Sequence, residues 1–333
     1  MNGLADFHHI EFRVSNALQS SFWYCCCFGF QRFAEKRDED ATCIAIRNGR
    51  VIFVIKSTTS CDPETLQQLV VHGDAVKDVA FRVDSIDALE QVLIPYTYSS
   101  KTLYRDSDIT HTLVEDRNYS GTFLPGYSPV DNFPLPANIP VVLLDHVVQN
   151  YPVNGIEDAA EWYKRSMALQ RFWSIDDKIT TSEFSAMKAW LITNDDQKVQ
   201  MTLAEAVPGR KGRSQIEVWN GLQQLCQDSV ILWPSRNMFP QSYYDILDER
   251  LKDSKVELKE DMKKLRELCI LMDFDDNGYL LQLFTRPVQD RPTLFIEIIQ
   301  RRNFNGFGAG NFKALFDAVE REQRRRGTLL VEN

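Results

Sequence analysis

The sequence lacks a surplus of positive charge and any long apolar run. Its formal net charge is −9, so we expect no electrostatic footprint for nucleic acid or an anionic membrane. No uninterrupted apolar stretch approaches the roughly 20 residues that span a bilayer, and the first residues lack the basic and apolar parts of a signal peptide. We therefore expect a cytoplasmic protein whose partner is a small molecule or another protein.

The sequence also lacks a cysteine pattern that could define disulfides. Seven cysteines are an odd number, and three of them are adjacent at Cys25–Cys27, without the spacing of a zinc site. We expect reduced thiols that pack as small apolar side chains.

An internal repeat organises the chain. The segment FHHIEF (Phe7–Phe12) precedes FWYCCCFGFQRF (Phe22–Phe33), and LDHVVQ (Leu144–Gln149) precedes EWYKRSMALQRF (Glu161–Phe172). In both copies Trp-Tyr precedes Gln-Arg-Phe at the same spacing. The chain is thus predicted to consist of two diverged copies of one unit, each beginning with a strand and a helix.

Matching segments also close the two copies. HTLVEDRNYSG (His111–Gly121) aligns with LFIEIIQRRNFNG (Leu294–Gly306) on Asn-aromatic-x-Gly. Between the ends, alternating apolar residues surround Asn48-Gly49 and Asn277-Gly278, and Asn-Gly is the strongest short hairpin signature. The fold class we predict is α+β, with two halves built of βαβββ modules.

Helical periodicity and proline mark the boundaries. Apolar positions recur at helical spacing at Leu18, Phe22 and Cys25 in the first copy, and over 156–167 in the second. Pro125–Pro140 is rich in proline and lacks periodicity, which is typical of a linker. We expect an N-terminal structural half over 1–136, a C-terminal catalytic half over 137–333, and a terminal amphipathic helix after Asn311.

Histidine is scarce, and only His146 of the five lies in the second half. It sits in an apolar strand, where a buried core histidine is the simpler interpretation of the pattern alone. Glu297 lies in a similar apolar strand, and a buried carboxylate needs a cation or a metal. Together they are two thirds of a 2-His-1-carboxylate triad, the site type that leaves positions on Fe(II) open for substrate and O₂.

Longer motifs carry a family resemblance. The run GYLLQLFTRPVQDRPTLFIEIIQRRNFNGFGAGNFKALF (Gly278–Phe316), together with LDHVVQN, FLPGY (Phe123–Tyr127) and HGDAVKDVAFRV (His72–Val83), resembles the 4-hydroxyphenylpyruvate dioxygenases over nearly the whole chain. The glycines at 306, 308 and 310 do not fit GxGxxG, which argues against a dinucleotide loop. The resemblance implies a vicinal-oxygen-chelate fold with Fe(II) held in the C-terminal half.

The resemblance also implies a set of site residues. His146 and Glu297 match the first and third iron ligands of the family. The matches to its polar catalytic pocket and its substrate shell are Gln282, Asn311, Ser214, Phe284, Phe307 and Phe312. For the three phenylalanines, simple core packing is the alternative. The implied substrates are 4-hydroxyphenylpyruvate and O₂, and homo-oligomerisation stays open.

One segment departs from the family. There, a Gly-Val-Gln-His strand supplies the second histidine ligand, but Arg213–Leu247 contains no histidine and is visibly shorter. Aligning the repeats places His9 opposite His146, Thr112 opposite Glu297, and Asp78 where the missing histidine would lie. The abrupt junction beside a well-matched Gly278–Phe316 favours the loss of an exon-like piece.

Three functional interpretations therefore stay open. The first is an iron-dependent dioxygenase that converts 4-hydroxyphenylpyruvate into homogentisate in tyrosine catabolism, impaired by the missing ligand. The second is an inactive member of the family that serves as a binding or assembly module. The third is an enzyme of the hydroxymandelate synthase type, which hydroxylates the side chain of the same substrate.

Overall fold

The structure is a computed structural model of the 333-residue chain. It describes residues 4–58, 62–86, 101–103, 109–131, 139–175, 186–207, 241–285, 289 and 294–311. Within these residues, every helix is too short or too polar to cross a membrane.

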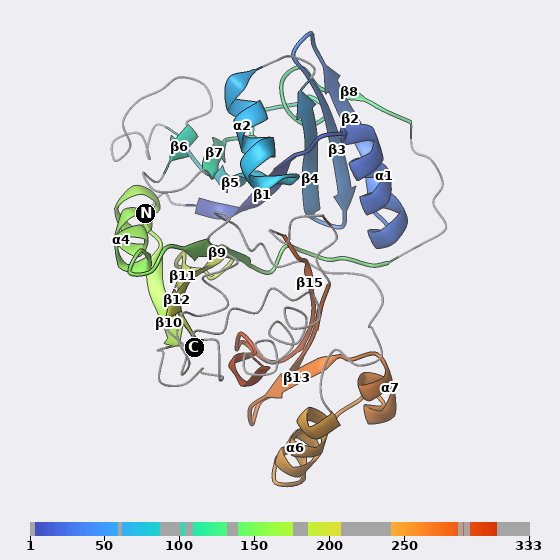
Figure 1. The fold of residues 1–333 in the computed structure, drawn as a ribbon, viewed down its shortest axis with the longest axis vertical. Coiled ribbons are helices and arrows are strands. Elements are labelled where there is room, and N and C mark those ends of the chain that lie inside the picture. Colours follow the sequence, from blue (N-terminus) through green and yellow to red (C-terminus); the bar gives the residue numbers. More distant parts are fainter. Residues whose placement is uncertain are drawn as a thin grey trace, which may run out of the picture.

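In the described part of the first half, eight strands form one sheet, accompanied by the helices α1 and α2 (Figure 1). The elements are β1 (Leu4–Arg13), α1 (Ala17–Phe28), β2 (Gln31–Arg37), β3 (Ala41–Asn48), β4 (Val51–Thr58), α2 (Pro63–His72), β5 (Ala75–Val83), β6 (Lys101–Leu103), β7 (Thr110–Val114) and β8 (Ser128–Pro129). The strand order is β6-β7-β5-β1-β4-β3-β2-β8. Strand β5 runs parallel to β7 and antiparallel to β1. It therefore joins β6 and β7 to the strands β1–β4 in one sheet.

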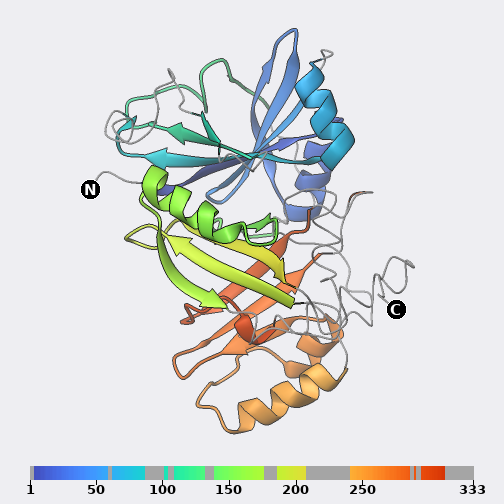
Figure 2. The same cartoon turned by 60° about the vertical axis from the view of Figure 1, so that its left-hand side comes forward.

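The second half contains two separate sheets, seen side by side in Figure 2. Its elements are β9 (Val147–Tyr151), α4 (Ile156–Met167), β10 (Gln170–Ile175), β11 (Ala186–Thr193), β12 (Gln200–Val207), α6 (Gln241–Lys252), α7 (Met262–Glu267), β13 (Leu271–Phe274), β14 (Tyr279–Phe284), β15 (Glu297–Arg302) and the 3₁₀ turn η1 (Ala309–Asn311). The sheet orders are β10-β11-β12-β9 and β13-β14-β15.

The predicted repeat is visible in the topology. Strand, helix and three strands follow each other in β1–β4 and again in β9–β12, and the first strand pairs in parallel with the last in both. The parallel ladders begin at Ile10 with Phe53 and at Val147 with Met201. Ile10 and Val147 directly follow the two aligned histidines, so the sequence alignment and the register agree. The α+β class is confirmed.

The halves differ at one strand. In β1, the residues before Ile10 pair with β5 alone, at Leu4 with Val83 and at His9 with Ala80. The corresponding residues, 141–146, belong to no strand. In the described part of the second half, β9 is the last strand of one sheet and β15 is the last strand of the other. A counterpart of β5 would lie between these two strands. Among the described residues, the second half therefore has the strand order of the first half without a strand at the central position.

Both predicted hairpins form. β3 and β4 pair up to Asn48 with Val51, and β13 and β14 pair up to Phe274 with Tyr279. Gly49 has φ +57°, and a Cβ there would lie 2.1 Å from the carbonyl oxygen of Val141. Glycine is required because both the left-handed backbone and the close approach exclude a side chain.

Some details of the prediction were wrong. The helix at 17–28 forms, but Leu18 and Phe22 are 47% and 60% exposed, and the face with Tyr24 and Phe28 is buried instead. Apolar residues surround this helix, so periodicity could not choose its buried face. Part of the predicted linker pairs with β2 as the short strand β8. Residues 132–138 of that linker and the predicted terminal helix lie outside the described residues.

The cysteines that the structure describes are not joined in disulfides. Those at positions 25, 43 and 269 are buried, and those at 26 and 27 are partly exposed. The prediction of reduced thiols is therefore confirmed for these five, although two are less buried than expected. Cys61 and Cys226 lie outside the described residues.

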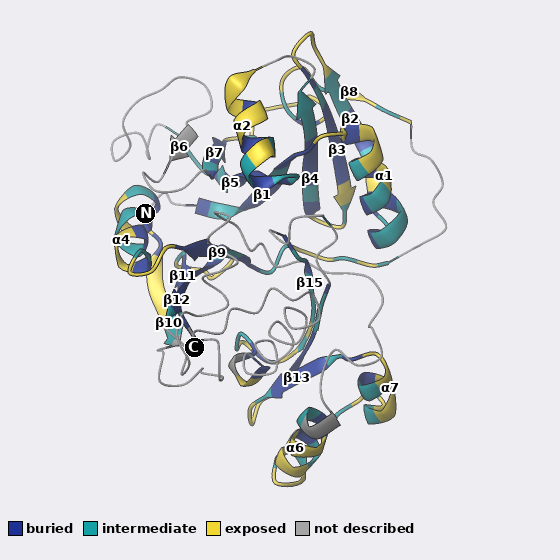
Figure 3. Ribbon diagram, viewed as in Figure 1, coloured by how far each residue is buried: buried dark blue, intermediate teal, exposed yellow. Residues whose placement is uncertain are grey.

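Buried residues lie along the strands of both halves (Figure 3), and two apolar clusters bear on the site. The larger spans the first sheet, α4 and β9–β12, and it also includes Leu294 and Ile296. A smaller one is built from α6, α7, β13 and β14, with Tyr244, Leu265 and Leu271 at its centre. The final module therefore has apolar packing of its own.

Two buried histidines should make the fold sensitive to acid. Burial lowers the pKa of His111, which contacts Val79 O and Tyr163 Oη, to about 4. Burial and then the nearby Arg82 lower the pKa of His8 to about 4. Since unfolding restores the ordinary value near 6.5, the unfolded chain binds more protons between pH 6.5 and 4. The contribution of these two histidines to the unfolding free energy is therefore complete above pH 6.5 and is lost as the pH falls toward 4.

We expect each histidine to remove about 1.4 kcal/mol of unfolding free energy per pH unit across this window. Urea unfolding at pH 7, 6 and 5 measures how the unfolding free energy changes with pH. His111→Gln should reduce this slope by the contribution of one proton, about 1.4 kcal/mol per pH unit. A slope that His111→Gln leaves unchanged would contradict the assignment.

Candidate functional site

Two side chains from the two separate sheets meet inside the second half. His146 immediately precedes β9, and Glu297 begins β15. Their atoms Nε2 and Oε2 lie 3.3 Å apart, with side chains only 7% and 4% exposed. Two donors in cis positions on one metal ion, each about 2.1 Å from it, lie about 3 Å apart. The pair is therefore spaced as two ligands of a single ion would be.

His146 and Glu297 are of the two ligand types that bind Fe(II) in a 2-His-1-carboxylate site, but a complete site of this type has three ligands. A neutral imidazole and a carboxylate are two members of the 2-His-1-carboxylate set. Among the described residues, no group of three or more His, Cys, Asp or Glu side chains could hold a metal. A complete triad is therefore not present in the part of the chain that the structure describes.

Asp145 and Arg301 fix the orientation of His146. Asp145 Oδ2 lies 2.8 Å from His146 Nδ1, which leaves Nε2 to face Glu297. Arg301 holds the same carboxylate with two hydrogen bonds of 2.7 and 2.8 Å. Such a carboxylate partner sets the tautomer and ring orientation of metal-binding histidines. The Arg301 guanidinium also donates to the carbonyls of Phe304 and Gly306, so it joins the ligand segment to the loop after β15.

These contacts determine the charge of the pair. Burial opposes the imidazolium, but hydrogen bonds to Asp145 and Glu297 outweigh it and raise the pKa of His146 to about 10. Burial also opposes ionisation of Asp145, yet hydrogen bonds from Arg301 and His146 hold its pKa well below the usual range. The hydrogen bonds to both carboxyl groups thus favour the protonated imidazole of His146. A metal ion has to displace that proton, so its binding depends on pH.

A chain of hydrogen bonds leads to Glu297 from the other side. The Tyr243 hydroxyl lies 2.7 Å from Asn311 Oδ1, Asn311 Nδ2 donates to Gln282 Oε1 at 2.6 Å, and Gln282 Nε2 donates to Glu297 Oε1 at 2.6 Å. The Tyr243 oxygen also accepts a hydrogen bond from Met272 N at 2.9 Å and lies 3.0 Å from Met272 O, so the backbone of β13 holds the hydroxyl in place. The chain therefore fixes both amides with their NH₂ groups directed toward the carboxylate.

The aromatic residues differ in their positions. The Phe307 ring stands edge-on to His146, with centroids 5.3 Å apart. Phe284 lies opposite Glu297 in the ladder and packs on Phe295. Ser214 and Phe312, which the sequence also suggested, lie outside the described residues, as does the helix expected to cover the site.

Sequence reasoning missed Asp145, Arg301 and Tyr243 as parts of this site. The sequence could have indicated Arg301, because alternate residues of a strand point to the same face. Residue 301 therefore lies on the same face of β15 as Glu297. Tyr243 lies in a segment with ordinary helical periodicity, so its hydroxyl contact with Asn311 had no signature in the sequence.

Comparison with solved structures identifies the fold. A solved structure described as a triple mutant of 4-hydroxymandelate synthase from Streptomyces coelicolor matches 97% of this chain and 100% of its own, with 26% identity and a TM-score of 0.73. A fusion protein of a xylose isomerase-like barrel and a 4-hydroxyphenylpyruvate dioxygenase matches 98% of this chain and 53% of its own at 17% identity, with a TM-score of 0.70, and supports the fold alone. No protein-family model matches the chain. The fold is therefore that of the vicinal-oxygen-chelate dioxygenases.

Sequence relatives narrow the class to one family. The 4-hydroxyphenylpyruvate dioxygenases of Caenorhabditis elegans and Danio rerio are 38% and 39% identical, with 98% of this chain and 94% and 92% of theirs covered. A putative protein of Caenorhabditis elegans is 52% identical, with 99% of this chain and 100% of its own covered. The chain belongs to the 4-hydroxyphenylpyruvate dioxygenase family.

The alignments also bear on the missing strand. They extend over 364, 371 and 368 positions, more than the 333 residues of this chain. The relatives therefore contain residues that have no counterpart here. The shortened interval inferred from the sequence agrees with this difference.

Proposed function

We propose that the chain is a 4-hydroxyphenylpyruvate dioxygenase whose iron site is reduced to two protein ligands, His146 and Glu297. It binds Fe(II) weakly and forms homogentisate from 4-hydroxyphenylpyruvate and O₂ slowly, in the cytoplasm. The observation that carries the proposal is the buried contact of 3.3 Å between these two side chains, each fixed by its own hydrogen bonds.

The chain's own residues would bind and orient the substrate. The amides of Gln282 and Asn311 are fixed by Tyr243, so they can donate to a polar group of the substrate without reorganisation. Phe307 beside His146 offers an apolar surface for an aromatic ring. Iron(II), held by His146 and Glu297, would supply the binding and activation of O₂.

The two halves have different roles in this proposal. Residues 1–136 form the structural half, because the positions of His146 and Glu297 are taken there by His9 and Thr112. Thr112 donates its hydroxyl to Asp78 at 2.8 Å, and this hydrogen bond lies within the sheet. Residues 137–333 form the catalytic half.

Metal binding is the direct test. The purified 333-residue protein should bind Fe(II) under anaerobic conditions more than about 100-fold more weakly than a complete family member, because even loss of an outer-shell partner costs about 10–100-fold. Isothermal titration with Fe(II) measures this, and a double variant, His146→Ala with Glu297→Ala, should abolish what remains. Stoichiometric iron in the unmodified protein would contradict the proposal.

Product analysis distinguishes the other interpretations. Homogentisate indicates ring hydroxylation, whereas 4-hydroxymandelate would indicate the activity named for the solved structural relative. An inactive binding module would bind 4-hydroxyphenylpyruvate, detected by titration, without consuming O₂.

A further inference from the structure

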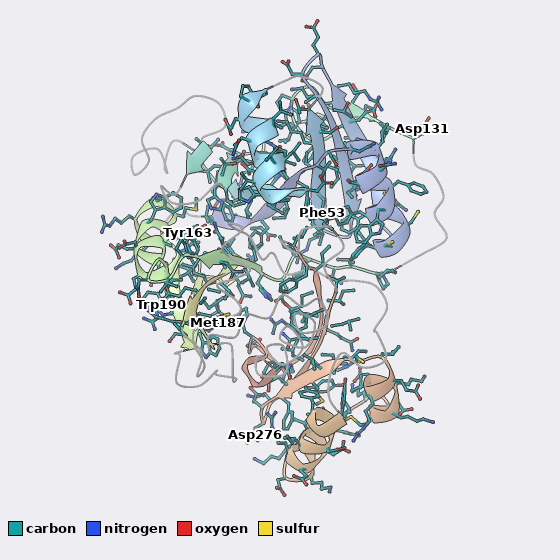
Figure 4. The ribbon with its side chains drawn as sticks, in the orientation of Figure 1. Phe53, Asp131, Tyr163, Met187, Trp190 and Asp276 are labelled. Carbon is teal, nitrogen blue, oxygen red and sulfur yellow. The ribbon has the colours of Figure 1, made fainter. Side chains whose placement is uncertain are left out.

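A pocket of the first half lies beside the histidine that is equivalent to His146. It has a volume of about 190 Å³ and is lined by the beginning of β1, the β3–β4 hairpin, Arg82 of β5 and residues 143–144. His9 is part of this lining, and the repeat aligns His9 with His146. Figure 4 labels Phe53, which directly follows the lining residue Ile52, at the end of the first sheet that faces the second half.

A β-bulge directs two histidines to the same side of β1. The register of β1 against β5 shifts between Phe7 and His9, so His8 is the additional residue. Consecutive strand residues normally point to opposite faces, but the Nδ1 atoms of His8 and His9 lie 2.7 Å apart, and both rings pack on Phe123. Bulges that redirect a side chain in this way are over-represented beside functional sites.

Three arginines line the pocket, in a chain whose formal net charge is −9. The guanidinium of Arg47 lies over the Phe33 ring, 4.8 Å from its centroid, and among the described residues no carboxylate pairs with it. Arg50 Nη1 lies 3.6 Å from Asp6, the carboxylate of the described lining. The hairpin therefore brings more positive than negative charge to the pocket.

Arg82 adds a third guanidinium. It donates to both carboxylate oxygens of Asp116 through Nε, at 3.0 and 3.1 Å, so its two terminal nitrogens take no part in that pair. After burial, the charge of Arg82 is the largest cause that lowers the pKa of His8 to about 4, and it outweighs the opposite effect of Asp116. The electrostatic field beside the two histidines is therefore positive.

We propose that this pocket, the arginine pocket, binds a small carboxylate with an apolar body. The carboxylate would accept hydrogen bonds from the guanidinium groups, whose planar shape matches its geometry. The apolar body would lie against Phe7, Val51 and Leu144, which also line the pocket. A cavity of about 150 Å³ holds a benzene molecule, so the arginine pocket is large enough for one aromatic acid.

The bound acid would also contact the chain just before the candidate iron site. Leu143 and Leu144 line the arginine pocket, and Asp145 and His146 follow them directly. Binding in the first half would therefore restrain the segment that carries His146. The proposal does not depend on the proposed activity, because neither iron nor turnover is needed for binding.

Isothermal titration of the full 333-residue chain with sodium benzoate at low ionic strength tests the proposal. We expect saturable binding, and at least about tenfold weaker binding of benzamide, which has the same shape without the charge. Acetate keeps the carboxylate without the apolar body and should also bind more weakly than benzoate. Benzamide that binds as tightly as benzoate, or benzoate that does not saturate, would overturn the proposal.

Two double variants locate the binding. Arg47→Gln with Arg50→Gln should weaken benzoate by about tenfold, since hydrogen bonds to a charged group are lost. Arg37→Gln with Arg117→Gln removes the same charge elsewhere and should leave the affinity unchanged. All four side chains are exposed, so both double variants should fold, and thermal unfolding checks this. Equal weakening by the two double variants would mean that only the net charge matters and would contradict the proposal.

A variant of the second half excludes binding at the candidate iron site. Phe307 packs on His146 and does not line the arginine pocket, so Phe307→Ala should leave benzoate binding unchanged. Loss of benzoate binding in Phe307→Ala, with full binding in the Arg47→Gln and Arg50→Gln double variant, would place the carboxylate in the second half and overturn the proposal.

Discussion

Inserting a Gly-Val-Gln-His strand into the interval between β12 and α6 is expected to restore Fe(II) binding and homogentisate formation together. The inserted strand would stand between β9 and β15, pair with both, and present an imidazole beside His146 and Glu297. Completing a three-ligand site should raise metal affinity by more than about 100-fold. Anaerobic Fe(II) titration and chromatography of the product measure the two effects separately.

The control insertion carries Gly-Val-Gln-Ala. It should restore the sheet, and with it thermal stability, but not iron binding. A single substitution in the same interval, Asp228→His, adds an imidazole without a strand and should also fail. If Asp228→His alone restored both properties, the strand would not be the missing element.

Replacing Arg301 by alanine is expected to be the most destabilising change near the site. Arg301 makes a bidentate contact with Asp145, and both side chains are only 22% exposed. Removing Arg301 takes two charge-assisted hydrogen bonds from the mostly buried Asp145 carboxylate and leaves it with His146, which costs about 3 kcal/mol. Urea unfolding at pH 7 measures the loss.

Two further variants separate the effect of the positive charge of Arg301 from the effect of its hydrogen bonds. Arg301→Lys keeps the charge but loses the paired hydrogen bonds and the carbonyl contacts, so it should fall between the wild type and Arg301→Ala. Adding Asp145→Asn to Arg301→Ala should recover part of the stability, because a neutral amide then replaces the carboxylate that lost its guanidinium partner. A double variant that loses the full sum of the single effects would show that the two residues do not act as a pair.

The sequence predicted the architecture well because its signals were local or repeated. Asn48-Gly49 specified a tight turn, and the aligned Ile10 and Val147 begin the same parallel ladder in both halves. Periodicity failed on α1, because a helix that is apolar on all sides does not reveal its buried face. The helical spacing of Leu18 and Phe22 suggested a buried face, whereas both side chains are exposed.

The candidate site was less accessible to sequence reasoning. His146 and Glu297 stood out as polar residues in apolar strands, and the structure brings them into contact. The hydrogen bond of Tyr243 to Asn311 joins residues 68 positions apart, and the pairing of Asp145 with Arg301 joins residues 156 apart. Such contacts depend on tertiary geometry that no local pattern encodes.

The tight turn at Gly49 has a consequence for how this chain tolerates change. Its contact with Val141 anchors the start of the second half to the first sheet, while α6, α7, β13 and β14 keep a separate apolar core. The two sides of the interval 208–240 are thus supported by different parts of the molecule. Natural or engineered replacement of this interval can therefore vary in length and composition without unfolding either neighbour, which makes it a suitable insertion point for grafted segments.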